Sequence, residues 1–196
     1  ASEQAAIIDQ EIYQEAKKLF VRFKTYFVNK EEKIKLSKFM FGYATNEEGV
    51  EQAKLNPNVV GKSAHWIAEQ AGFEIPEDTA IIAAECSFVG PKEPLTREKL
   101  SPVLAILKSK NEEEGFKFAE EMVCFNGLGH SAAIHCKEQK MADDFGERVK
   151  AMRIIWNSPS TFGGIGNVYN SFLPSLTLGC GSYGRNSIGV NVSAVN

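Results

Sequence analysis

Hydrophobic residues along the chain follow two alternating patterns, short continuous runs and longer stretches with helical spacing. A continuous run of about four to eight apolar residues is typical of a buried strand, and apolar residues three and four positions apart indicate an amphipathic helix. The runs that predict strands are 5–9, 79–85, 103–109, 130–136 and 153–158. The stretches that predict helices are 9–27, a segment after Asn29, 63–72, a segment after Asn111, and 138–150.

Residues that favour helix ends support two of these boundaries. Ser63 is a natural N-cap, because its hydroxyl can accept a hydrogen bond from a backbone amide of the first turn, and Gly72 is a natural stop. Three glutamates follow Asn111 directly. Their negative charge complements the positive end of a helix dipole. We therefore expect one helix to start after Ser63 and another after Asn111.

The alternation of strands and helices predicts the fold class. Continuous apolar strands between amphipathic helices are typical of a parallel sheet that is covered on both faces. We expect an α/β fold with a doubly wound, mostly parallel sheet and helices on both faces, in one domain over residues 1–196. Beyond Asn157, glycine, serine, proline and asparagine dominate. We expect residues 158–196 to form an active-site loop and tail, since long loops of this kind are often functional.

Composition and charge exclude several functional classes. The chain has 22 Lys and Arg against 25 Asp and Glu, for a net charge of −3. Its basic residues are scattered singly, so we expect no nucleic-acid partner. Apolar runs such as 80–84 are too short to span a membrane, and no signal-peptide pattern opens the chain. The four cysteines form no C-x-x-C pair, so we expect free thiols in a cytoplasmic protein.

The sequence "GCGSYG" at 179–184 matches the G-x-G-x-x-G spacing of a dinucleotide-binding turn. That turn works only between a strand and a helix, with an acidic residue about 20 positions later for the ribose. Only "RNSIGVNVSAVN" follows, without Asp, Glu or a helical pattern. We therefore interpret the motif as a glycine-rich loop. Cys180 within it could act as a nucleophile, but nothing in the sequence places His130 or His135 beside it, and free cysteines are commonly small buried hydrophobes.

Four possible metal ligands are close in the sequence, at Cys124, His130, His135 and Cys136. Strand alternation sends His130 and Cys136 to one face and His135 to the other, and Cys124 belongs to the preceding helix. These donors do not converge into the tetrahedral set that zinc prefers. We expect no metal in this domain.

His130 and Glu98 are more informative singly. His130 follows "NGLG" at the start of a predicted strand, where a glycine-rich loop can bring an imidazole close to a ligand. A structural histidine and a functional one remain open alternatives. Glu98 precedes the strand at 103–109, where its carboxylate could accept hydrogen bonds from sugar hydroxyls or be a solvated loop charge.

Five longer stretches resemble a known family over the full length of the chain. The chain is similar to the aldehyde dehydrogenase half of bacterial bifunctional acetaldehyde–alcohol dehydrogenases, in the CoA-acylating branch of the aldehyde dehydrogenase superfamily. The stretches are "ASEQAAIID" (1–9), "REKLSPVLA" (97–105), "GLGHSAAI" (127–134), "NSPSTFGGIGNVYN" (157–170) and "PSLTLGCGSYGRNS" (174–187).

The resemblance implies a reaction and roles for six residues. An aldehyde, NAD⁺ and coenzyme A would interconvert with acyl-CoA and NADH, without a metal in this domain. Glu98 matches the glutamate that holds the nicotinamide ribose hydroxyls, and His130 matches a histidine near the catalytic thiol, as a proton carrier or polar partner. The cofactor-binding loop that closes over the active-site mouth would be formed by Leu178, Gly179, Cys180 and Gly181.

The chain also departs from the family pattern. The family's nucleophilic cysteine immediately precedes "ASEQ", so it would lie before Ala1, and the cofactor-binding domain and the C-terminal alcohol dehydrogenase extension have no counterpart here. We therefore expect the chain alone to be inactive, and the parent protein to bind a small aldehyde and CoA and to form a homo-oligomer or filament. Two alternatives remain: a non-catalytic assembly module of such a filament, and a small thiol enzyme that uses Cys180 and His130.

Overall fold

The computed structural model describes residues 3–166 and 170–192. The chain divides into two compact units, one formed by Glu3–Phe118 and the other by Ala119–Asn196. Each unit is described separately. Among the described residues no helix is both long enough and apolar enough to cross a membrane. The expected position of the nucleophile, next to Ala1, and parts of the predicted tail at 167–169 and 193–196 lie outside the described residues.

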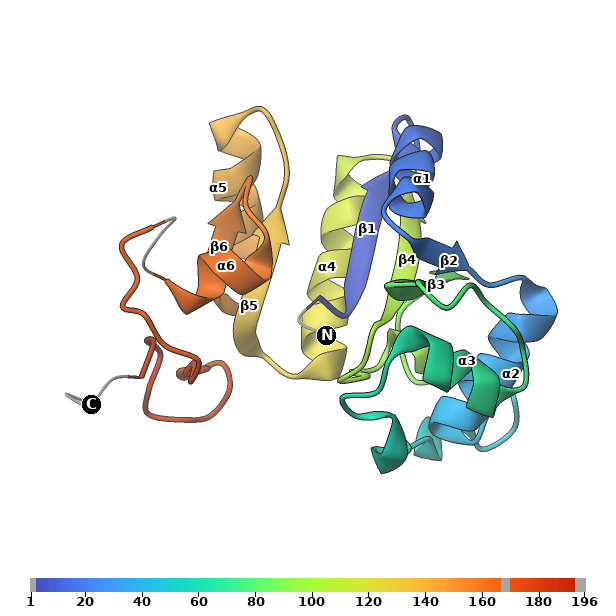
Figure 1. The fold of residues 1–196 in the computed structure, drawn as a ribbon. Coiled ribbons are helices and arrows are strands. Elements are labelled where there is room, and N and C mark those ends of the chain that lie inside the picture. The colour runs from blue at the N-terminus through green and yellow to red at the C-terminus, as the bar shows by residue number, and fades with distance from the viewer. Residues whose placement is uncertain (1–2, 167–169, 193–196) are drawn as a thin grey trace. The chain divides into compact units, whose positions relative to one another are not determined.

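The first unit is built on a four-stranded sheet whose strands are all parallel (Figure 1). Neighbouring strands are joined by helices and loops rather than by tight hairpins, as parallel pairing requires. In spatial order the strands are β1 (Ala5–Asp9), β4 (Val103–Ser109), β3 (Ile81–Cys86) and β2 (Thr25–Phe27).

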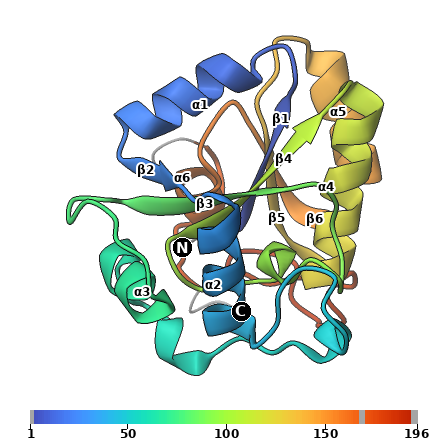
Figure 2. The same ribbon diagram turned by 90° about the vertical axis from the view of Figure 1, so that its right-hand side faces the viewer.

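The central strand β4 is buried on both faces. Leu104 and Ile106 point to one face, where Tyr13 and Phe20 of α1 (Tyr13–Arg22) pack against them. Figure 2 shows α1 alongside β1 and β2 of this sheet. The alternate residues, Val103, Ala105 and Leu107, are also almost fully buried. The parallel α/β fold class that the continuous apolar strands predict is therefore confirmed.

Side chains and a glycine define the helix ends of the first unit. Asn29 accepts hydrogen bonds from the amides of Glu31 and Glu32, and Glu32 reaches back to the Asn29 amide, which completes a capping box. Ser63 caps the next helix and Gly72 ends it in the left-handed conformation, as predicted. The remaining helices of this unit are α2 (Lys30–Phe41), α3 (Ala64–Ala71) and the short 3-10 turns η1 (Val50–Gln52), η2 (Pro57–Val59) and η3 (Pro94–Thr96).

The predicted helix over 9–27 is wrong in its second half. α1 ends at Arg22, Lys24 takes a left-handed conformation with φ of 66°, and Thr25–Phe27 forms β2. The apolar spacing continues into β2 because the Phe27 ring packs edge-on against Phe20 at 6.4 Å. A β-branched residue followed by two aromatic residues suits a strand, and pairing with β3 satisfies its backbone.

The second unit holds a separate two-stranded parallel sheet. Its strands are β5 (Gly129–Ile134) and β6 (Ala151–Trp156), and its helices are α5 (Gln139–Arg148) and α6 (Ser160–Ile165). α4 (Glu112–Asn126) starts in the first unit and ends in the second, and the amide of Glu114 donates to the Asn111 side chain, as the predicted cap requires. The strands therefore lie in two sheets, rather than in the single sheet that we predicted.

Both strands of this sheet end earlier than predicted. Asn157, with φ of 53°, exchanges side-chain hydrogen bonds with the backbone N and O of Cys136 at 3.0 and 2.9 Å. These side-chain hydrogen bonds replace the backbone hydrogen bonds between the two strands beyond Ile134 and Trp156. His135 and Cys136 therefore follow β5 instead of belonging to it.

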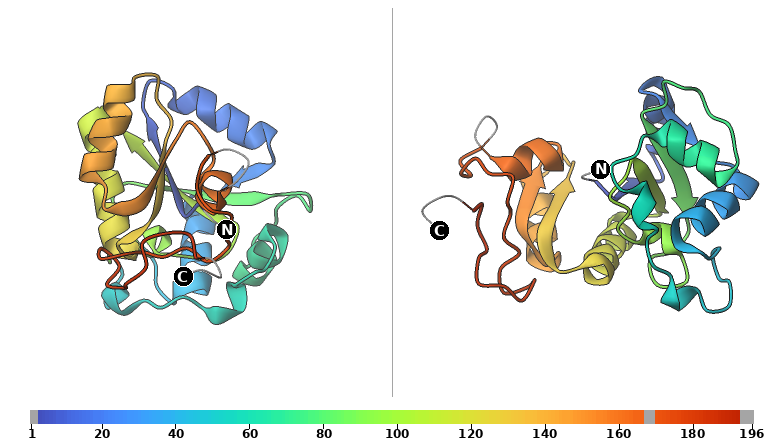
Figure 3. Two further views of the ribbon diagram at one scale, coloured as in Figure 1. Left: turned by 90° about the vertical axis from the view of Figure 1, so that its left-hand side faces the viewer. Right: turned by 60° about the horizontal axis from the view of Figure 1, so that its bottom comes forward.

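The predicted loop after Asn157 contains regular elements. α6 packs against β5 and β6, and the chain that follows it, drawn in red, bends back on itself (Figure 3). An antiparallel bridge joins Leu178 to Asn191, and the amides of Gly179 and Gly181 donate to the carbonyls of Val190 and Ile188. The loop is a hairpin-like turn held by backbone hydrogen bonds.

Candidate active site

The second unit brings the backbone of His130 together with the predicted cofactor loop at 178–181. Arg153 of β6 donates to the carbonyl of His130 at 3.3 Å and to the carbonyl of Gly179 at 2.9 Å. The amide of Gly184 donates to the Cys180 carbonyl at 3.1 Å, which closes the turn. The His130 side chain itself is exposed. An exposed imidazole on a fixed backbone is suited to proton transfer with a bound substrate.

Glycines of "GCGSYG" permit close packing of this turn. A Cβ atom at Gly179 would lie 2.0 Å from the Ile188 carbonyl oxygen, and one at Gly184 would lie 2.3 Å from the Cys180 Cβ. No side chain fits at either position. The spacing that resembles a dinucleotide fingerprint therefore reflects the packing of a hairpin turn, as the missing strand–helix context indicated.

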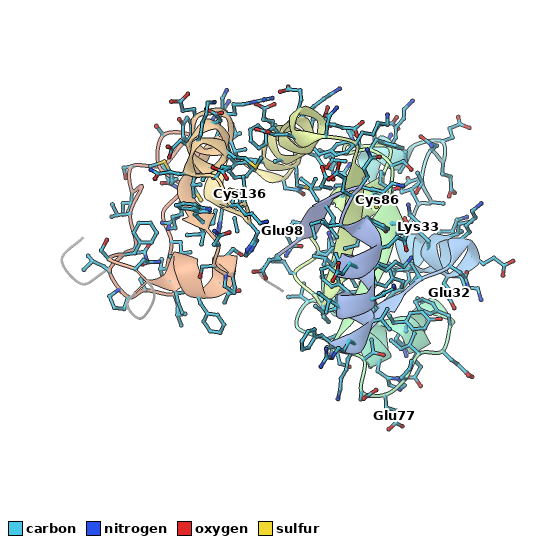
Figure 4. The ribbon with its side chains drawn as sticks, turned by 90° about the horizontal axis from the view of Figure 1, so that it is seen from above. Glu32, Lys33, Glu77, Cys86, Glu98 and Cys136 are labelled. Carbon is cyan, nitrogen blue, oxygen red and sulfur yellow. The ribbon has the colours of Figure 1, made fainter. Side chains whose placement is uncertain are left out.

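Glu98 lies in the first unit, in the loop between η3 and β4, and its side chain is exposed. The structure does not relate its position to that of His130, because the two residues belong to different units. Glu98 is labelled in Figure 4. An exposed carboxylate on an anchored loop is a suitable acceptor for sugar hydroxyls.

Lys99 anchors this loop, although no sequence signal marks it. Its side chain is fully buried, and Nζ donates to the carbonyls of Gln4, Leu95 and Arg97 at 2.8 to 2.9 Å. The Lys99 amide also donates to the Gln4 side chain at 2.7 Å. Lys99 therefore ties the loop that carries Glu98 to the segment that enters β1. A lysine between a charged and an apolar residue gives no sequence signal for such burial, since lysine is rarely buried.

Burial lowers the pKa of Lys99 to about 8, and nearby Cys86 and Glu98 oppose this shift only in part. Folding thus lowers this pKa from 10.5, so the unfolded chain binds more protons between pH 8 and 10.5. The contribution of Lys99 to the free energy of unfolding should rise across that window by about 3 kcal/mol. Lys99→Met should abolish this rise. Urea unfolding of both proteins at several pH values measures it.

The matched background for this test is Trp156→Phe, which leaves Trp66 of the first unit as the only tryptophan. The comparison of two proteins that differ only at Lys99 cancels contributions from groups that do not interact with Lys99, such as Tyr13. The Cys86 thiol interacts with Lys99, so both proteins also carry Cys86→Ala. A difference in stability that stays constant from pH 8 to 10.5 would show that the Lys99 pKa is not lowered.

Cys86 lies beside a buried ion pair at the end of β3 (Figure 4). Lys33 of α2 donates to the Glu93 carboxylate and to the Glu85 carbonyl, both at 2.7 Å, and Glu93 is only 1% exposed. Burial, reinforced by Glu93, raises the pKa of the Cys86 thiol to about 12. A thiol held in its protonated form is a poor nucleophile, so Cys86 is structural.

The other cysteines do not assemble a catalytic or metal-binding cluster in the part of the chain that the structure describes. All four cysteines are free thiols, and Cys124 is exposed on α4. No hydrogen bond joins the His130 imidazole to the Cys180 thiol there. No group of three or more His, Cys, Asp or Glu side chains is placed to hold a metal ion among the described residues. The structure thus gives no support to the alternative of a thiol enzyme built from Cys180 and His130.

A surface hollow of about 450 Å³ in the first unit contains none of the candidate residues. It combines two aromatic rings, Phe39 and Trp66, with Lys62, whose Nζ lies 5.2 Å from the centroid of the Trp66 ring. Its other lining residues are Pro57, Asn58, Val60 and Gln70. The hollow has no carboxylate, thiol or histidine to pair with Lys62, so it assembles no acid–base or nucleophile–base pair.

Comparison with known proteins shows relatives along the whole chain, although no protein-family model matches it. The aldehyde-alcohol dehydrogenase of Streptococcus pneumoniae is 64% identical over 196 residues, which cover 100% of this chain and 22% of that protein. The bifunctional aldehyde-alcohol dehydrogenase AdhE of Escherichia coli is 37% identical over 98% of this chain and 21% of its own length. The chain thus spans about a fifth of the length of these relatives.

A solved structure agrees with these matches. The crystal structure of an acetylating aldehyde dehydrogenase from Geobacillus thermoglucosidasius superposes with a TM-score of 0.88 and 38% identity. The superposition covers 100% of this chain and 41% of that one. A likeness in sequence and fold that extends over the whole chain agrees with the resemblance carried by the five sequence stretches. The chain is therefore similar, along its whole length, to one region of bifunctional aldehyde-alcohol dehydrogenases and of acetylating aldehyde dehydrogenases.

Proposed function

We propose that this chain forms part of the active site of a CoA-acylating aldehyde dehydrogenase. The overall reaction is acetaldehyde + NAD⁺ + CoA to acetyl-CoA + NADH + H⁺. The aldehyde carbon gives up a hydride to NAD⁺, the CoA thiol gives up its proton, and a thioester C–S bond forms. The observation that carries the proposal is that Arg153 donates hydrogen bonds both to the backbone of His130 and to the 178–181 loop. The chain that holds this arrangement is similar to an acetylating enzyme over its whole length.

The chain's own residues would act by orientation and proton transfer. His130 would carry protons between substrate and solvent, since its imidazole is exposed and its backbone is fixed. The 178–181 loop would line the mouth of the site, where its glycines let backbone approach a ligand closely. Glu98 would accept hydrogen bonds from the ribose hydroxyls of NAD⁺, which supplies the hydride acceptor when bound. Free thiols support a cytoplasmic site for this activity.

Glu98→Gln in the full-length protein tests the cofactor part of this proposal. Hydrogen bonds to a charged acceptor contribute about 1.5–3 kcal/mol, so kcat/KM for NAD⁺ should fall about 10- to 100-fold. The fall should appear mainly in the KM for NAD⁺, measured in CoA-dependent oxidation of acetaldehyde.

Glu77→Gln is the matched control, because Glu77 is another exposed glutamate of the first unit (Figure 4). It should leave the kinetics unchanged. An unchanged KM for NAD⁺ in Glu98→Gln would remove Glu98 from the cofactor site. Absence of CoA-dependent NADH formation by the wild-type full-length protein would refute the proposed function itself.

That the chain is an assembly module remains a prediction. The oligomeric state of the parent protein also remains a prediction. Sedimentation velocity separates the two functions. Concentration-dependent assembly of the isolated chain would favour a role in filament formation, and a monomer at all concentrations would oppose it.

A further inference from the structure

Arg153 is a buried guanidinium in the sheet of the second unit. It lies on β6, is 2% exposed, and its pKa is lowered by burial. None of the residues that the structure describes pairs a carboxylate with it. A buried charge without a counter-ion costs free energy, and its hydrogen bonds must offset that cost. Retaining an arginine here therefore calls for a reason beyond packing.

The guanidinium makes its hydrogen bonds to three different segments. Nε donates to Asn191 Oδ1 at 2.8 Å, and Nη1 donates to the carbonyls of Gly179 at 2.9 Å and His130 at 3.3 Å. The β5–β6 register pairs Arg153 with Ser131, the residue directly after His130. One side chain thus joins the start of β5 to both sides of the hairpin-like turn.

Asn191 extends this network on the far side. Its Nδ2 donates to the carbonyl of Gly164 in α6 at 2.9 Å and to that of Leu173 at 2.7 Å. Asn191 is 4% exposed, so these hydrogen bonds are shielded from water. Hydrogen bonds that are buried away from water are strong, and they restrict the orientation of the groups that they join.

The geometry points to Arg153 as a positioning residue for the proposed reaction. It does not contact the reacting atoms. It fixes the backbone of His130 relative to the 178–181 loop, so that the proton carrier and the cofactor loop keep one arrangement. This inference depends on the proposed function. The planar guanidinium of arginine can donate hydrogen bonds to several acceptors in fixed directions. The single ammonium group of a lysine cannot reach all of these acceptors at once.

The test is Arg153→Lys in the full-length protein, which keeps the charge and removes the planar guanidinium. We expect kcat/KM for NAD⁺ in CoA-dependent acetaldehyde oxidation to fall on the order of 100-fold, as for a small displacement of reacting groups. We also expect faster hydrogen exchange at the amides of Gly179 and Gly181, which this network holds in the turn. Arg148→Lys is the control, because Arg148 pairs with Glu120 in the same unit, and it should change neither quantity.

A merely structural role would give a different result. It would lower the unfolding midpoint and the fraction of folded enzyme, with a normal KM for NAD⁺ and normal exchange in the folded fraction, and that outcome would overturn the inference. If Arg153→Lys does not fold, Asn191→Ala removes one acceptor of the network and should show the same changes on a smaller scale. Wild-type kinetics in Asn191→Ala would then refute the inference. Failure of the wild-type protein to reduce NAD⁺ would count against the proposed function. Hydrogen exchange at Gly179 and Gly181 would still test whether Arg153 anchors the 178–181 loop.

Discussion

The purified 196-residue chain is expected to form no NADH from acetaldehyde, NAD⁺ and CoA. The resemblance assigns the attacking sulfur to a cysteine that directly precedes "ASEQ", and none of the chain's four cysteines stands there. Of these four, Cys86 is buried with a pKa of about 12. Loss of the nucleophile in other covalent enzymes lowers kcat on the order of a millionfold. NADH absorbance under saturating substrates measures the rate.

The full-length protein is the positive control for this assay, and the same protein with its nucleophilic cysteine replaced by alanine should be as inactive as the chain. The informative contradiction is NADH formation by the chain that disappears in Cys180→Ser. That result would assign catalysis to Cys180. Cys124→Ser serves as the matched control, because Cys124 is exposed on α4, outside the candidate site.

Local signals predicted the elements whose stability is local. The side chains of Ser63 and Asn111 satisfy amides of the helices that follow them, so a few adjacent residues suffice to predict these helix starts. β2 shows the limit of this reasoning. Its three residues, Thr25–Phe27, continue the apolar spacing of α1, and only pairing with β3, which is distant in sequence, makes them a strand. A helical period cannot reveal such a partner.

The same limit applies to the site. The motifs and the family resemblance predicted His130 and the 178–181 loop as site residues, whereas no sequence signal marks Lys99 or Arg153. Both are charged residues that sequence reasoning assigns to the surface, and both are buried with their donors on backbone carbonyls. Lys99 reaches one distant carbonyl, that of Gln4, and Arg153 reaches those of His130 and Gly179. A backbone carbonyl is present in every residue, so the amino-acid sequence does not reveal which carbonyls will accept these hydrogen bonds. The hydrogen bonds that position the candidate groups are therefore visible only in the folded structure.

Gly129→Ala is expected to dismantle the turn at 179–184. Gly129 has φ of 94°, and a Cβ atom there would lie 2.1 Å from the Cys180 carbonyl oxygen and 2.9 Å from the Gly184 nitrogen. Backbone strain costs about 1–3 kcal/mol, and the clash with backbone adds about 1–3 kcal/mol more. Urea unfolding in a Trp66→Phe background, followed by the fluorescence of Trp156 in the second unit, measures the loss in the free energy of unfolding. The full-length variant should lose CoA-dependent activity.

Gly127→Ala separates the clash from the strain. Gly127 also has a positive φ, of 112°, but a Cβ atom there would meet nothing within 4 Å. It should lose only the strain contribution, about 1–3 kcal/mol, and keep normal hydrogen exchange at Gly184, whose amide donates to Cys180. Equal losses in the free energy of unfolding for the two variants would mean that the start of β5 does not contact the turn at 179–184. Because the proposed arrangement of His130 and the 178–181 loop depends on that contact, the same result would remove its structural basis.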